Sequence, residues 1–149
     1  MRAGWFRRGL ALPAAERRLA VEAFILLAVS RVMLALLPFR VAMDWLGLRL
    51  VHGAGPGEEG NVPAPVVPLV GEAVCRAAAI APFRAVCLQQ AVTAALMLRR
   101  RGHATEVHFG VAKDGNGNMI AHAWSRCQGR LVTGGRQMPQ YQPISVFVT

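Results

Sequence analysis

Residues 87–102 spell CLQQAVTAALMLRRRG, and residues 105–112 spell TEVHFGVA. In the first segment, apolar side chains recur at the spacing of a helix, and Gly102 supplies a left-handed exit. In the second segment, apolar residues alternate with polar ones, which is the period of a strand. The sequence therefore predicts a helix that starts near Cys87 and a strand directly after it.

Two turn signals follow this strand. The segment DGNGN at residues 114–118 is typical of a hairpin turn, so residues 119–126 are expected to return as a second strand. A second tight turn at residues 128–129 leads into a short strand at residues 130–133. These strands are expected to form an antiparallel meander that packs on the helix of Cys87.

The part of the chain before residue 87 has mostly helical patterns. Residues 13–36 are expected to form one helix, which Pro38 ends. A shorter helix is expected over residues 41–51, although Gly47 weakens it. Residues 70–81 are rich in alanine and have helical spacing, so they are expected to form a third helix before Pro82.

Glycine and proline concentrate between the second and third of these helices. Such a segment favours a loop or linker. The expected division is an N-terminal helical region at residues 1–52, a linker at residues 53–68 and a core at residues 69–149. The predicted fold class is α+β, with N-terminal helices followed by a helix packed on an antiparallel sheet.

Length and composition fit a single globular domain, since the 149 residues are 54% hydrophobic. The 17 Lys and Arg against 8 Asp and Glu give a net charge of +9, which favours an anionic peptide, nucleic acid or a membrane surface. The three cysteines are an odd number without paired spacing. A disulfide framework is therefore not expected, and a reducing cytoplasm is the expected compartment.

The apolar stretch at residues 19–39 raises the question of a membrane span. Glu22 and Arg31 divide it into runs shorter than the roughly 18 apolar residues that a span needs. Arginines precede it as in a signal peptide, but no small-residue cleavage site follows. We expect a buried or interfacial helix, which leaves contact with a membrane surface open. The preceding arginines are Arg7, Arg8, Arg17 and Arg18.

Cys87 and His122 are the candidate catalytic residues. The start of a helix favours the thiolate form of a cysteine, and a nearby imidazole can take the thiol proton. His122 lies in the middle of a predicted strand, between two alanines that leave room for a packed element. A buried cysteine and a strand histidine are more often structural than catalytic, so this pattern alone is a moderate signal.

A larger pattern contains both residues. CLQQAVTAALMLRRRG is followed by HFGV at residues 108–111, AHAW at residues 121–124 and GR at residues 129–130. In order and spacing this pattern resembles the protease of lasso peptide maturation, a transglutaminase-like and papain-like cysteine peptidase family. The resemblance covers about residues 82–134 and extends loosely to the N-terminal helix with LPFR at residues 37–40.

The resemblance implies a cysteine endopeptidase of the standalone B type, with Cys87 and His122 as its catalytic pair. It would remove the leader from a lasso precursor peptide, together with a leader-recognition protein and an ATP-using lasso cyclase. A cytoplasmic protein with no cofactor, no metal and no nucleic-acid partner is expected. Two alternatives stay open: a non-catalytic pseudoenzyme that binds the precursor, and an acyl-transferring transglutaminase-like enzyme.

The third member of the site is not evident. Where the family typically has an Asp, this sequence has Gly134. Counting back through the hairpin places His108 near His122 and Glu106 near Trp124, on one face of the sheet. We hypothesise that Glu106 orients His122. The alternative is that Glu106 is only a solvated strand residue. His108, Thr133, Gln137 or a backbone carbonyl are the other candidates.

The remaining polar residues near the pattern have plainer explanations. Gln89 or Gln90 could help an oxyanion, but helix glutamines are usually solvated, and the backbone N–H of Cys87 is the better donor. Trp124 is expected to fill the core or to shield the site. Cys75 is expected to be a small buried hydrophobe, and Cys127 an exposed residue at a turn.

Overall fold

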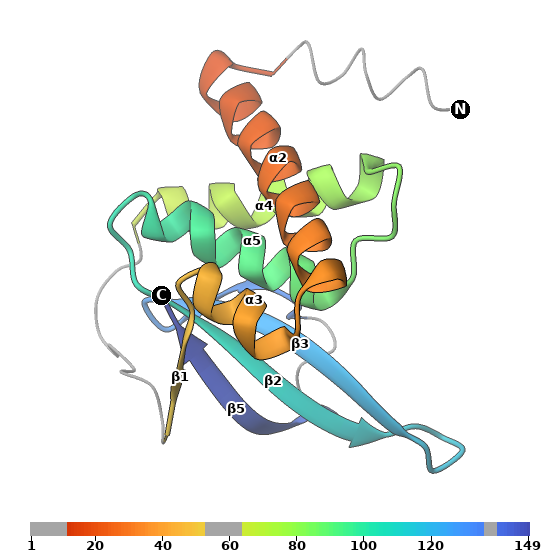
Figure 1. The fold of residues 1–149 in the computed structure, drawn as a ribbon. Coiled ribbons are helices and arrows are strands. Elements are labelled where there is room, and N and C mark those ends of the chain that lie inside the picture. Colours follow the sequence, from red (N-terminus) through yellow and green to blue (C-terminus); the bar gives the residue numbers. More distant parts are fainter. Residues whose placement is uncertain (1–11, 53–63, 136–139) are drawn as a thin grey trace.

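The described helices all come before the main strands of the sheet in the chain. The computed structural model describes residues 12–52, 64–135 and 140–149 (Figure 1). Its elements are α2 (Ala14–Leu36), α3 (Phe39–Trp45), β1 (Arg49–Val51), α4 (Val66–Ile80), α5 (Cys87–Arg99), β2 (Thr105–Lys113), β3 (Met119–Cys127), β4 (Arg130–Thr133) and β5 (Gln142–Val148). The predicted α+β class, with helices on an antiparallel sheet, is confirmed.

In the described part of the chain, the sheet has five strands in the order β1-β5-β2-β3-β4, and their pairs are antiparallel. Asp114 shapes the β2–β3 hairpin, because its side chain accepts hydrogen bonds from the backbone N–H groups of Asn116 and Asn118. The next turn has positive φ at Gln128 and Gly129. Both predicted turns are therefore confirmed.

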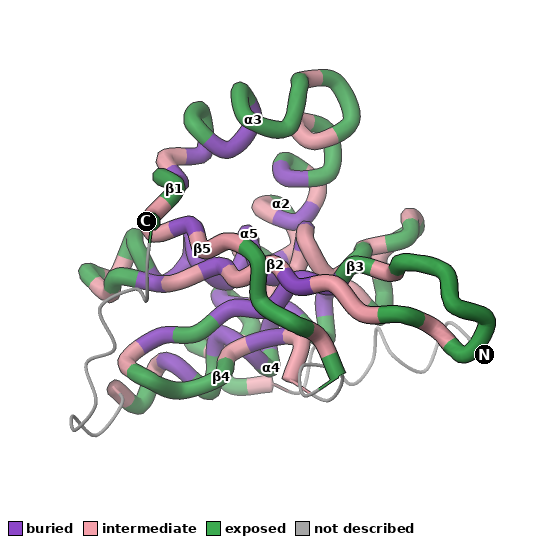
Figure 2. The backbone as a smooth tube through the Cα atoms, turned by 90° about the horizontal axis from the view of Figure 1, so that it is seen from below, coloured by how far each residue is buried: buried purple, intermediate pink, exposed green. Residues whose placement is uncertain are grey.

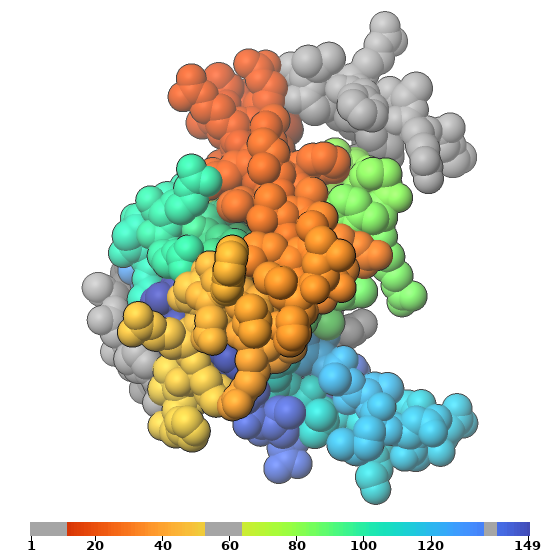
Figure 3. Space-filling view, viewed as in Figure 1, coloured from red at the N-terminus to blue at the C-terminus, as the bar shows by residue number. Residues whose placement is uncertain are grey.

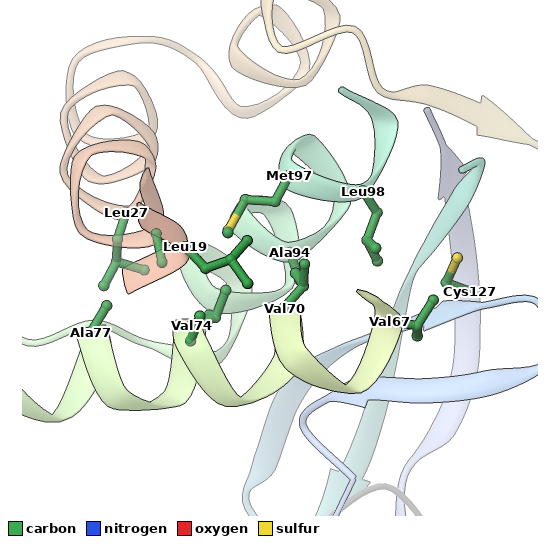
Figure 4. Packing of buried hydrophobic residues seen from close by; sticks show 12 residues of the cluster. Leu19, Leu27, Val67, Val70, Val74, Ala77, Ala94, Met97, Leu98 and Cys127 are labelled. Atoms are coloured by element: carbon green, nitrogen blue, oxygen red, sulfur yellow. The ribbon is translucent and has the colours of Figure 1, made fainter. Parts of the chain in front are cut away.

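Helix α5 is the central element of the core. One side of it packs with α2 and α4, where buried residues such as Leu19, Val74 and Met97 meet (Figure 4). The other side packs on the sheet through a second cluster that contains Val92 and Val107. Figure 2 shows the buried stretches running through the middle of the sheet and the inner sides of the helices. Burial on both sides holds the start of α5 at a fixed place over the sheet.

The helix predicted over residues 41–51 is wrong in its second half. Helix α3 ends at Trp45, and Gly47 follows with φ +74°. Residues Arg49–Val51 then pair with β5 as an edge strand. A left-handed turn stops the helix here, and the tertiary pairing with β5 outweighs the local helical pattern.

Helix α4 begins at Val66 rather than at residue 70, so the last part of the predicted linker is helical. Pro68 is tolerated because it lies in the first turn, where a backbone N–H has no helical partner. Residues 53–63 of that linker lie outside the described residues. The division into three regions therefore stays a prediction, although α2 packs in the same core as α4 and α5.

Candidate active site

Cys87 is the first residue of α5, and neighbouring side chains fix the entry to this helix. The Oε1 atom of Gln89 accepts a hydrogen bond from the N–H of Val86 at 3.1 Å, and Nε2 of Gln90 donates to the carbonyl of Ala85 at 3.0 Å. The expectation of solvated glutamines is thus wrong, since both side chains bond the backbone just before the helix and Gln89 is buried. The half-buried Cys87 lies where unpaired backbone N–H groups favour an anion.

His122 is held on β3 by a backbone acceptor. Its Nε2 atom lies 2.8 Å from the carbonyl oxygen of Gly134, and the residue is 7% exposed. A carbonyl oxygen only accepts hydrogen bonds, so this contact assigns the ring proton to Nε2. In the neutral ring, Nδ1 is then the unprotonated nitrogen, which is the form a general base requires.

The backbone at Gly134 is compatible only with glycine. Its φ is +79°, and a Cβ atom there would lie 2.7 Å from the carbonyl oxygen of Ala123 and 2.8 Å from Cβ of Trp124. An Asp at this position would need the chain to move away from β3. The backbone carbonyl of Gly134 therefore makes the contact with His122, which is one of the alternatives that the sequence left open.

Glu106 contacts a different histidine from the one predicted. Its Oε2 atom lies 2.8 Å from Nε2 of His108. The predicted register is wrong by two residues, because His122 pairs with Gly110 and His108 pairs with Trp124. The predicted common face is correct, since a shift by two residues preserves the side of the sheet.

Aromatic rings enclose His122 on this face. Trp124 stacks on it with ring centroids 6.1 Å apart, and the ring of Tyr141 lies 5.0 Å away. His108 also stacks on Trp124, with ring centroids 5.5 Å apart. Trp124 is buried, so it both fills space and shields the histidine.

Two residues of this enclosure were missed by the sequence reasoning. Gly110 makes room for the enclosure, because a Cβ there would lie 2.9 Å from the Trp124 ring and 2.9 Å from Cβ of Tyr141. A glycine inside a strand pattern is a signal for such a close approach. Tyr141 gives no comparable signal in the sequence. Gln137, another candidate, lies outside the described residues.

The structure does not join Cys87 to His122 by a hydrogen bond; within the described ranges, the Cys87 thiol has no such partner. Ala123 packs in the cluster that contains α5 residues, so strand alternation directs His122 to the opposite face. However, β4 pairs with β3 only from Ser125 onward. At His122, β4 has already ended, and the chain at Gly134 lies beside β3 instead.

The other cysteines lie differently from expectation. Cys127 is 1% exposed and its Sγ donates to the carbonyl of Ala104 at 3.4 Å, so the prediction of an exposed residue is wrong. Burial raises the pKa of the Cys127 thiol, which disfavours its thiolate. Cys75 is exposed rather than buried, because it faces outward on α4. Among the described residues, no group of three or more His, Cys, Asp or Glu could hold a metal ion.

A cysteine at the start of a helix, packed on an antiparallel sheet that carries a histidine, defines the class of papain-like and transglutaminase-like folds. Within this class, the chain belongs to the transglutaminase-like superfamily, whose family model matches residues 33–146. The matched range includes Cys87, His122 and Gly134. This superfamily includes cysteine peptidases and acyltransferases. No curated protein and no solved structure is similar enough to this chain to give a match.

Proposed function

We propose that this protein is a cysteine endopeptidase that removes the leader from a ribosomally made lasso precursor peptide. Cys87 is the nucleophile and His122 is the general base. The observation that supports this best is the hydrogen bond from Nε2 of His122 to Gly134, because it leaves Nδ1 to accept the thiol proton. Membership of a superfamily that contains cysteine peptidases supports the same chemistry.

The reaction follows from these roles. Nδ1 of His122 takes the proton of the Cys87 thiol, and the thiolate attacks the carbonyl carbon of the scissile peptide. The backbone N–H of Cys87 stabilises the oxyanion. The imidazolium then protonates the leaving amine, and water hydrolyses the thioester to release the leader with a carboxylate end. The step requires the Cys87 thiol and the His122 ring to come together when substrate binds.

The partners in this proposal are the lasso precursor peptide, a leader-recognition protein and the lasso cyclase, which uses the newly released amine. The net charge of +9 favours encounter with an acidic leader or partner surface. The proposed compartment is the cytoplasm.

The test is cleavage of the precursor in the presence of its leader-recognition protein, followed by mass spectrometry. The wild-type chain should release separate leader and core fragments. Cys87→Ala and His122→Ala should release neither, whereas the matched control Cys75→Ala, at an exposed site on α4, should cleave normally. Full cleavage by folded Cys87→Ala would refute the proposal.

A second candidate is a non-catalytic protein that binds the precursor. It is favoured by the missing hydrogen bond between Cys87 and His122 and by Gly134 in place of an Asp. In that case the wild type would bind the precursor without cutting it, and Cys87→Ala would bind equally well. An acyl-transferring enzyme would instead give a cross-linked product with the mass of both substrates less one ammonia or one amine leaving group.

A further inference from the structure

Helix α2 has a continuous apolar strip on its outer side. Its residues are spaced by three or four positions, so they lie on one face, and each is between 41% and 77% exposed. We call this set the α2 strip: Val21, Ile25, Val29, Val32 and Leu36. By length and composition, α2 is also a helix that could cross a membrane.

The inner side of α2 is fixed to the rest of the protein. Ser30 is buried and its hydroxyl lies 3.5 Å from that of Thr93 on α5. Glu22 forms an ion pair with Arg101 at 2.6 Å. A helix that spanned a bilayer would have to leave these partners and the core. The fold therefore favours a helix that lies along a surface with the α2 strip outward.

Charged groups on α2 leave the α2 strip uninterrupted. Glu22 is directed to Arg101, and Arg31 donates to the carbonyl of Arg84 at 3.2 Å. Both charges are thus engaged by the protein at the flanks of the helix. Arg31 is exposed, but it lies off the line of positions 21, 25, 29, 32 and 36, so the α2 strip itself contains no charged side chain. This is unusual for a helix face exposed to water.

Helix α3 extends the same surface. Figure 3 shows α2 and α3 side by side on one face of the molecule. The main exposed apolar residue of α3 is Trp45, which is 74% exposed, whereas Phe39 packs on the rings of Phe109 and Phe147. Tryptophan is favoured at the boundary between lipid and water, where its ring is amphipathic.

Exposed arginines stand at both ends of the α2 strip. Arg17 and Arg18 precede it, and Arg40 follows it. An anionic surface would attract both ends. A second copy of this chain packed antiparallel along the strip would bring Arg17 and Arg18 against Arg40 of the other copy, and like charges would then oppose each other.

We propose that the α2 strip and α3 form a surface that binds an anionic lipid bilayer, with α2 lying in the interface plane. The apolar side chains enter the headgroup region, and the arginines at the two ends contact lipid phosphates. This binding does not depend on the chemistry of Cys87 and His122.

The test is co-sedimentation of the full chain with vesicles of phosphatidylcholine alone or mixed with phosphatidylglycerol. The wild type should bind the mixed vesicles and bind less at high salt. The double variant Ile25→Glu with Val32→Glu should lower the partition coefficient by at least about tenfold, because charges are strongly disfavoured in the apolar region. Reversing the charges of Arg17 and Arg18 should also weaken binding.

The matched control is Met119→Glu with Ile144→Glu, which places the same charges at sheet residues 65% and 63% exposed. This control should bind vesicles like the wild type, and circular dichroism should show that all variants are folded. The proposal is overturned if the wild type binds neither vesicle, or if the double variant on α2 binds as well as the wild type. A dimer in sedimentation velocity that the α2 variant abolishes, without vesicle binding, would identify a second copy as the occupant instead.

Discussion

Replacing Gly134 by alanine tests whether the backbone there is pressed against β3 in the way that holds His122. The positive φ should cost about 1–2 kcal/mol in an L-residue with a side chain. The new Cβ would also lie 2.7 Å from the Ala123 carbonyl oxygen, and overpacking of this kind costs about 1–3 kcal/mol. The expected loss in the free energy of unfolding is therefore about 2–5 kcal/mol, the sum of the two ranges.

Gly117→Ala is the matched control. Gly117 has φ +82°, but nothing lies within 4 Å of a Cβ at that position. The Gly117→Ala variant should lose only the free energy of unfolding that the positive φ costs, about 1–2 kcal/mol. The difference between the two variants then measures the close approach of Gly134 to β3.

Urea denaturation followed by circular dichroism gives both free energies, and precursor cleavage gives the effect on the site. Gly134→Asp, which introduces the residue typical of the family, should destabilise the fold and should not raise cleavage. If Gly134→Ala cost no more than Gly117→Ala, the chain would not be pressed on β3. The backbone account of how His122 is oriented would then be wrong.

Three further outcomes are expected. Burial raises the pKa of Cys127, so iodoacetamide should label it much more slowly in the native protein than after unfolding, and equal rates in peptide mapping would contradict its burial. Hydrogen bonds from Asn118 lower the pKa of Asp114, so its stabilising effect is present above the unfolded pKa of about 3.9 and is lost as the pH falls through the lower folded value. Asp114→Ala should therefore flatten the acid side of a plot of melting temperature against pH. Glu22→Gln should lower the free energy of unfolding by about 1–3 kcal/mol, because Glu22 and Arg101 form a partly buried pair; an unchanged urea midpoint would contradict this.

Local chemistry was enough to predict much of the fold. Pro38 follows the end of α2, Gly102 provides the left-handed turn after α5, and the Asp114 turn sets the β2–β3 hairpin. In each case a residue with few backbone options lies at the boundary. The strand Arg49–Val51 could not be predicted in this way, because its conformation depends on β5, which is far away in the sequence.

The places of Cys87 and His122 in the fold were predictable, but the contacts of their side chains were not. Cys87 was expected at the start of a helix and His122 in a strand, and both lie there. Their catalytic roles stay predictions. The partner of His122 is a backbone atom, and a carbonyl oxygen is present at every residue, so no sequence pattern distinguishes Gly134 from its neighbours by that group. Positive φ at a glycine is also visible only in three dimensions.

The pairing of β1 with β5 has a consequence for synthesis. Arg49 pairs with Val148, so β1 finds no neighbour in the sheet until nearly all of the described chain has left the ribosome. Helices α2, α4 and α5 can associate earlier, since their contacts do not need β5. The nascent chain is therefore expected to carry a helical core while β1 is still unpaired. The last step of sheet formation then pairs β1 with β5, the two strands that lie farthest apart in the sequence.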